Sequence, residues 1–268
     1  MENIDDFLSG QRLYGDDFTL EQIREWYDDE KEGYAELGAK DRSTYTYLYH
    51  SLNYHHGFRY LKGRDRFNNV LGVGSAYGDE FLPILPRIKS LTLLDPSDVF
   101  SQDKIHDVPC TYVKPAVDGS MPFEDQSFDL TTCLGVLHHI PNVTTVVNEV
   151  FRCLSVGGYV LVREPITSMG DWTKPRPGLT KRERGIPIGV FRNIVQDAGF
   201  VIIHEAFCMF PVVQRICKSL RLPLYNSAVA TWLDAQSARA FSWNARYHAD
   251  KWIQKFRPGC IYFVLTKL

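Results

Sequence analysis

From residue 67 onward, short runs of aliphatic and β-branched residues alternate with longer amphipathic segments. The short runs, which we expect to be strands, cover residues 69–74, 90–95, 111–114, 128–134, 159–164, 200–210 and 260–265. Helical periodicity is present over residues 81–88, 143–154 and 188–198. Strands that alternate with helices of this length indicate a parallel α/β sheet with right-handed crossovers and helices on both faces.

Two regions depart from this alternation. Residues 1–17 have no regular pattern, and we expect them to be loosely structured. A helix is expected from Leu20, because apolar residues then recur at helical spacing and Thr19 and Gln22 suit a capping box. A second helix, rich in tyrosine and histidine, is expected over residues 43–61. It either packs on the main domain or forms a lid over a ligand.

The pattern suggests three parts. Residues 1–64 form an N-terminal helical lid, and residues 65–210 and 259–268 form the α/β core. Residues 211–258 lie between the last two strands and form an inserted, mainly helical cap. A chain of 268 residues suits one large α/β domain with such additions.

Composition narrows the class of protein. The hydrophobic share of 44% is ordinary, and there is no apolar run near the ~18 residues that span a membrane. The acidic N-terminus does not resemble a signal peptide. The six cysteines are scattered, which favours reduced core residues in a cytoplasmic protein. A net charge of −2 gives no sign of nucleic-acid binding.

A glycine-rich turn over residues 72–78 follows the first strand. Its glycines allow a positive φ and a close approach of the backbone to a nucleotide-like ligand, although an ordinary tight turn is also consistent with it. Asp95 ends the next strand. An acid at this edge of a parallel sheet can accept both hydroxyls of a ribose, or it can cap the following helix.

Three further blocks follow in order: Pro-Phe-Glu-Asp-Gln-Ser-Phe-Asp over residues 122–129, Leu-His-His over residues 137–139, and the pair Gly157-Gly158. With the glycine turn and Asp95, they make residues 66–210 resemble the class I S-adenosylmethionine (SAM)-dependent methyltransferases of the ubiquinone-type and glycosyl O-methyltransferase group. The resemblance implies a Rossmann-like, doubly wound sheet of seven strands in the order 3-2-1-4-5-7-6, with the last strand antiparallel, and SAM as the cofactor.

The resemblance places cofactor-binding residues at Gly72, Gly74, Ser75, Asp95, Pro96, Asp118, Gly119 and Leu134. Gly72, Gly74 and Ser75 would line the methionine and ribose side, and the backbone of Leu134 would meet the cofactor ammonium. The chain departs from the family at two positions. Gly72 stands where the family usually has an acid, and Ala76 stands where it usually has glycine. A methyltransferase-like protein that binds SAM without turnover is therefore an alternative.

Methyl transfer to a hydroxyl requires a positioned acceptor and a base for its proton. His138 and His139 follow the fourth strand, and Glu164 ends the fifth. We expect His139 to be the base and Glu164 to orient it, although the histidine pair could instead stabilise its loop. No metal site is expected.

The acceptor side is predicted from the long loop over residues 165–187. An aromatic residue and cations there suit a sugar, a phosphate or a carboxylate, unless the loop is simply solvated; the candidates are Trp172, Arg176, Arg182 and Arg184. The inserted segment is basic as well, which fits a packed cap, docking on an anionic lipid surface, or a phosphate-bearing carrier.

We therefore expect a SAM-dependent O-methyltransferase that acts on a hydroxyl of a sugar or glycan precursor. The C-terminal part of the chain resembles bacterial methyltransferases associated with polysaccharide biosynthesis. The alternatives are methylation of a small-molecule quinone, polyketide or amine, and a non-catalytic SAM-binding protein. A nucleic-acid partner is not expected, because the chain has no Asn/Asp-Pro-Pro-Tyr/Phe motif.

Overall fold

The computed structural model describes residues 4–37, 42–43, 45–172, 174, 176 and 178–268. Its centre is one sheet in the order β3-β4-β2-β1-β5-β6-β8-β7. The strands are β1 (Phe67–Val73), β2 (Ile88–Leu94), β3 (Lys104–Ile105), β4 (Val108–Val113), β5 (Phe128–Leu134), β6 (Leu154–Pro165), β7 (Val201–Cys208) and β8 (Cys260–Thr266).

The predicted order of seven strands is confirmed. The strands β4, β2, β1, β5 and β6 are parallel neighbours, and β8 runs antiparallel to both β6 and β7. The eighth strand, β3, is a two-residue edge strand that pairs antiparallel with β4. It is too short to leave a periodic pattern in the sequence.

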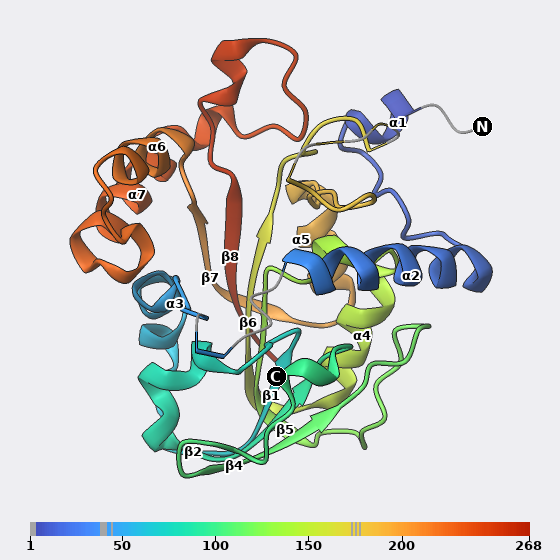
Figure 1. Ribbon diagram of the computed structural model, residues 1–268, viewed down its shortest axis with the longest axis vertical. Coiled ribbons are helices and arrows are strands. Elements are labelled where there is room, and N and C mark those ends of the chain that lie inside the picture. Colours follow the sequence, from blue (N-terminus) through green and yellow to red (C-terminus); the bar gives the residue numbers. More distant parts are fainter. Residues whose placement is uncertain (1–3, 38–41, 44, 173, 175, 177) are drawn as a thin grey trace.

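Helices cover both faces of the sheet (Figure 1). On one face lie α3 (His50–His56), α6 (Pro211–Ser219) and α7 (Ala228–Ala240), and on the other lie α4 (Val143–Cys153) and α5 (Ile188–Asp197). The strand β1 supplies both cores, since Leu71 and Val73 pack on the α4 side and Val70 on the α3 side. Strands buried on both faces are typical of a parallel sheet within two helical layers.

Two predicted helices differ from expectation. In the segment expected to be helical over residues 43–61, the described residues form only α3 and the short 3-10 helix η1 (Phe58–Tyr60). Residues 45–49 are not helical; they are mostly tyrosine and threonine, which are weak helix formers. The segment after the glycine turn is the 3-10 helix η2 (Asp79–Arg87), because Pro83 and Pro86 lack the N–H groups that an α-helix requires.

Near the N-terminus, the expectation of loose structure is corrected by α1 (Ile4–Leu8), whose Phe7 is buried. The capping box is confirmed at the start of α2 (Leu20–Leu37), where the Thr19 N–H donates to Gln22 Oε1 at 2.9 Å. In the described part of the chain, none of the helices is both long enough and apolar enough to span a bilayer.

The N-terminal segment is attached to α4 by one carboxylate. Asp16 accepts the backbone N–H of Thr144 at 2.8 Å and its hydroxyl at 2.6 Å. The N-cap residue of α4, Asn142, makes no side-chain capping bond. Asp16 therefore caps α4 from a distant part of the chain.

We predict that Asp16→Ala lowers the free energy of unfolding by about 1–2 kcal/mol, because α4 loses its cap and a charged hydrogen bond. Urea denaturation followed by circular dichroism measures the change. The control is Asp17→Ala, which removes only an exposed ion pair with Arg12 and should cost less than about 0.5 kcal/mol. Equal effects of the two substitutions would contradict this role of Asp16.

Candidate active site

Two cavities meet where β1 ends, and Val73 and Gly74 line both of them. The first cavity lies at the end of β2 and is covered by α2; its lining includes Ile23, Trp26, Tyr27, Asp95, Pro96, Gly119 and His139. The second has a volume of about 450 Å³, which is within the ~300–1,000 Å³ range of small-molecule sites. Its lining includes Tyr45, Tyr47, Tyr49, Ser75, Glu80, Leu134, His138 and Arg163.

Neighbouring side chains lie so close to the glycine turn that they restrict which residues fit there. At Gly74, with φ +62°, an added Cβ would lie 2.6 Å from a methyl group of Val136. Ala76 also has a positive φ, +47°, at the position where the family usually has glycine. Gly72 lines neither cavity, and Ser75 Oγ occupies the space that a Cβ at residue 72 would need. Gly74 and Ser75 do line the cavities, whereas the contact expected between Gly72 and the cofactor stays a prediction.

Asp95 is buried at the junction of the glycine turn and β2. One carboxylate oxygen accepts the Ala76 N–H at 3.1 Å, and the other accepts the Ser97 N–H at 3.0 Å. Burial raises the pKa of this carboxyl above its ordinary value. The two backbone bonds fix the carboxylate at the wall of the first cavity, where it can also accept hydroxyl groups.

Of the neighbouring candidates, Pro96 and Gly119 line the first cavity, and Leu134 lines the second. Asp118 does not belong to either lining, because its carboxylate turns back to accept the N–H and the hydroxyl of Ser120. This local turn leaves the Asp118 side chain exposed. The contact expected between Asp118 and the cofactor stays a prediction.

Glu164, at the end of β6, organises the turn that contains the two histidines. Its buried carboxylate accepts the N–H groups of Val136 and Leu137 at 2.8 Å each, and it lies 2.7 Å from Nδ1 of His138. Burial alone would raise the pKa of Glu164, but the His138 ring and the backbone N–H groups hold it below the ordinary value. Burial, together with the adjacent His139, lowers the pKa of His138.

The expected pairing of Glu164 with His139 is therefore wrong. His139 Nδ1 instead lies 2.8 Å from the carboxylate of Glu30 on α2, and its backbone carbonyl accepts the indole N–H of Trp26 at 2.7 Å. The two rings diverge because they are consecutive residues in a 3-10 turn, η4 (Leu137–His139). His138 lines the second cavity, and His139 lines the first.

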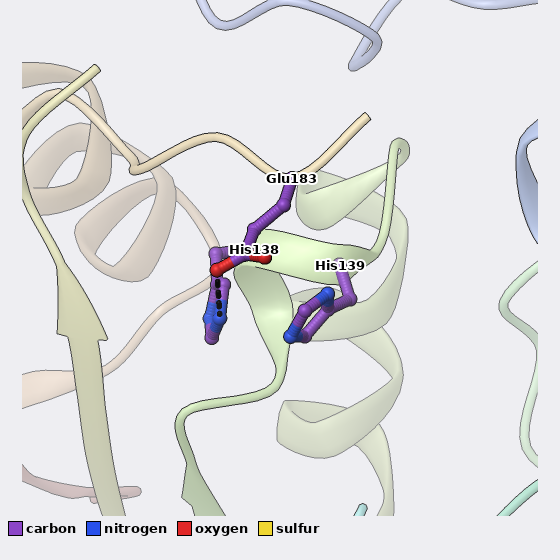
Figure 2. A group of neighbouring side chains, drawn as sticks. All are labelled: His138, His139 and Glu183. Carbon is purple, nitrogen blue, oxygen red and sulfur yellow. Dashed lines mark ion pairs between the residues drawn. The ribbon is translucent and has the colours of Figure 1, made fainter. Parts of the chain in front are cut away.

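Figure 2 shows that Glu183 approaches the same pair of rings. Glu183 Oε1 lies 3.6 Å from Nε2 of His138, and one ligand atom from each of the three residues falls within 4.8 Å of the others. Such a set could hold a metal ion, or it could pass a proton from His138. The sequence alone gave no reason to place Glu183 here.

The four candidates for substrate binding do not line either cavity. Trp172 is buried against Phe7 and Tyr14, and Arg182 binds Asp29 of α2. Arg176 donates to backbone carbonyls of its own loop. Arg184 is fully buried and donates to carbonyls of the histidine turn, namely those of Leu137, His138, Ile140 and Pro141.

Arg182 and Arg184 therefore attach the loop to the rest of the protein, whereas Arg176 connects two parts of the loop itself. The loop contributes Pro165 and Met169 to the second cavity instead. Sequence reasoning also missed Glu80 and Arg163, which bring opposite charges to that cavity. Glu80 lies two residues after the glycine turn, and Arg163 lies one residue before Glu164, so both are close in sequence to residues already singled out.

The comparisons with known proteins agree with this geometry. The family model described as "Methyltransferase domain" matches residues 71–162. The ubiquinone/menaquinone biosynthesis C-methyltransferase UbiE of Xylella fastidiosa is 39% identical over 56 residues, which are 21% of this chain and 22% of that protein. The chain thus matches only about a fifth of the length of this curated relative.

Solved structures share the fold. An S-adenosylmethionine-dependent methyltransferase from Mesorhizobium loti gives a TM-score of 0.51 at 17% identity, over 77% of this chain and 94% of that one. The YcgJ protein of Bacillus subtilis gives a TM-score of 0.50 at 17% identity, over 81% of this chain and 98% of that one. Residues 71–162 therefore form a methyltransferase domain, and the chain shares the fold of these solved structures.

The residues present fit SAM, the cofactor that the resemblance implies. Asp95, Pro96 and Gly119 line the first cavity, and Gly74 lines both cavities where they adjoin. In the second cavity, the buried hydroxyl of Ser75 lies beside the carboxylate of Glu80.

We predict that Asp95→Asn weakens binding of S-adenosylhomocysteine, the demethylated product, about 10- to 100-fold, because the loss of a charged acceptor costs ~1.5–3 kcal/mol. Isothermal titration calorimetry measures the affinity. The matched control is Asp98→Asn on the exposed turn after β2, where the carboxylate pairs only with Lys114 at the surface. An Asp95 variant that binds as tightly as this control would contradict the ribose-binding role.

Proposed function

We propose that the protein is an O-methyltransferase that acts on a hydroxyl of a sugar or glycan precursor. One observation carries the proposal: His138, held by a buried carboxylate, lines the second cavity beside the point where Gly74 joins it to the first. A base therefore lies at the wall of the cavity that an acceptor would enter. The six cysteines of the chain are free and buried, which supports a reducing, cytoplasmic location.

SAM, when bound, supplies a methyl group activated by its sulfonium. Asp95, Pro96 and Gly119 would hold the adenosine part, and Gly74, Ser75 and Leu134 the methionine part. The protein's own task is then to position the acceptor and to remove its proton.

His138 is suited to that second task. The ionised carboxylate of Glu164 can only accept, so the proton of the ring lies on Nδ1 and Nε2 keeps its lone pair. Because its pKa is lowered, the ring is neutral at pH 7 and ready to take a hydroxyl proton. Glu183 beside Nε2 would stabilise the imidazolium that forms. General base catalysis of this kind contributes about 10²–10⁴-fold.

The other walls of the cavity support a sugar acceptor. Tyr45, Tyr47 and Tyr49 offer flat apolar surfaces and hydroxyl groups at one side of the cavity, as ring-shaped polar ligands require. The basic cap over residues 211–258 is consistent with a phosphate-bearing glycan precursor or with contact to an anionic membrane surface.

A second candidate is C-methylation of a quinone precursor. It is favoured by the 39% identity to UbiE, although the matching segment has only 56 residues. Both reactions remove an acceptor proton, so His138 has the same task in each. The position of the new methyl group in the product distinguishes them.

We predict that the wild-type protein transfers labelled methyl groups from SAM to hydroxyls of nucleotide- or lipid-linked sugars. His138→Gln should reduce kcat about 10²–10⁴-fold, because the base is lost, and leave the affinity for S-adenosylhomocysteine within about twofold. Scintillation counting measures the rates, and the carbon chemical shift of the new methyl group separates O-methyl from C-methyl products.

The control is His106→Gln, which changes a histidine outside both cavities and should leave kcat unchanged. Transfer to a quinol carbon but to no sugar would replace the first candidate with the second. A His138 variant with normal kcat would reject the base in either reaction. Binding of SAM without transfer to any acceptor would support the non-catalytic alternative.

A further inference from the structure

Two oppositely charged and buried side chains line the second cavity without forming an ion pair with each other in the described structure. Glu80 comes from η2 and is 4% exposed; Arg163 comes from β6 and is 6% exposed. The guanidinium of Arg163 donates only to neutral oxygens, those of Asn53 at 3.4 Å and Leu134 at 3.2 Å, among the described residues. It also lies 4.2 Å from the centre of the Tyr49 ring.

Such an arrangement is costly without a ligand. A buried charge that lacks an opposite charge loses hydration without compensation. Two hydroxyl groups are the side-chain donors to Glu80 among the described residues: that of Ser75, which lowers the pKa of Glu80, and that of Thr132, at the long distance of 3.4 Å. Burial accordingly raises the pKa of Glu80 to about 7.

Tyr47 connects the two charges. Its hydroxyl accepts a hydrogen bond from the side-chain NH₂ of Asn53 at 2.6 Å. The side-chain oxygen of Asn53 accepts a hydrogen bond from Arg163. Its pKa is raised by burial, and the charges of Arg163 and Glu80 act on it in opposite directions. Both charges are therefore close to the same tyrosine, on the wall of one cavity.

The position of Glu80 also accounts for the missing acid at residue 72. A side chain at residue 72 would collide with Ser75 Oγ and with Leu93. Glu80 instead brings a carboxylate to the cavity from the next element of the chain, beside Ser75. The negative charge that Gly72 lacks is thus available at the same end of the glycine turn.

We propose that Glu80 and Arg163 form a zwitterion site, in which Glu80 binds the ammonium and Arg163 the carboxylate of an α-amino acid group. The group that fits is the amino acid end of SAM, so the inference rests on the cofactor of the proposed function. Glu80 then takes over the role of the acid that is absent at Gly72.

Binding at Glu80 should release protons, and the groups around Glu80 determine how many. The other titratable groups that act on it or respond to it are Asp79, Tyr47, Cys110, Tyr112 and Tyr262. Burial raises the pKa of each of these tyrosines and of the cysteine, so they are neutral near pH 7 and add no opposing charge. A bound ammonium would lower the pKa of Glu80, so the protein should release about half a proton at pH 7.

The experiment is calorimetry of the full chain with S-adenosylhomocysteine at pH 7, in two buffers of different ionisation enthalpy. We expect the wild-type protein to release protons on binding and its affinity to rise from pH 6 to pH 8. Glu80→Gln should abolish the release and weaken binding at least 10-fold, and Arg163→Met should weaken it similarly. Neither variant should change the affinity for 5′-methylthioadenosine, which lacks the amino acid group.

The control for affinity is Asp79→Asn, one residue earlier in η2, whose carboxylate binds Arg42 and does not line the cavity. It should keep the wild-type affinity and release fewer protons, because the charge of Asp79 contributes to the raised pKa of Glu80. Absence of binding to the wild-type protein would overturn the cofactor assignment itself. Wild-type binding with no proton release, or with unchanged affinity in both variants, would overturn the zwitterion site and leave the proposed function standing. The zwitterion site would also be overturned if the variants lost the same affinity for S-adenosylhomocysteine and for 5′-methylthioadenosine. Glu80 and Arg163 would then only support the fold.

Discussion

The site depends on one buried carboxylate. Glu164 accepts the N–H groups of the turn after β5 and the ring of His138, while Arg184 donates to the carbonyls of the same turn from the other side. This anion accepts three N–H groups of the buried turn and this cation donates to four of its carbonyls, which would be costly to leave unpaired. The turn forms the wall between the two cavities, so the geometry of both follows from it.

The N-terminal helix belongs to the same network. Glu30 of α2 contacts His139 and also accepts the hydroxyl of Thr180 and the N–H of Arg182. Because Trp26 lines the first cavity, α2 forms part of the wall of that cavity and is more than an external lid. The loop over residues 165–187 holds α2 in this position through Arg182 and Asp29. A separate segment of the chain thus completes the pocket that the parallel sheet begins.

Features encoded locally in the sequence were predictable. The glycine turn and the position of Asp95 follow from short motifs at the ends of strands, and the order of the strands follows from the resemblance to a family. The pairing of Glu164 with His138 was not predictable, because two adjacent histidines point to different cavities according to the exact form of a 3-10 turn. The role of Arg184 was not predictable either, since a cation in a basic loop gives no sign that it will be fully buried. Glu80 could have been considered, because it follows a glycine turn that lacks its usual acid.

The central claim is that Glu164 holds His138 as a neutral base, with its proton on Nδ1. Nitrogen-15 NMR of the imidazole rings tests this directly, with the signals of His138 assigned through their absence in His138→Gln. We predict a protonated Nδ1 and an unprotonated Nε2 at pH 7, and a midpoint of titration below the ordinary 6.5. A proton on Nε2, or a ring that titrates above 6.5, would contradict the account.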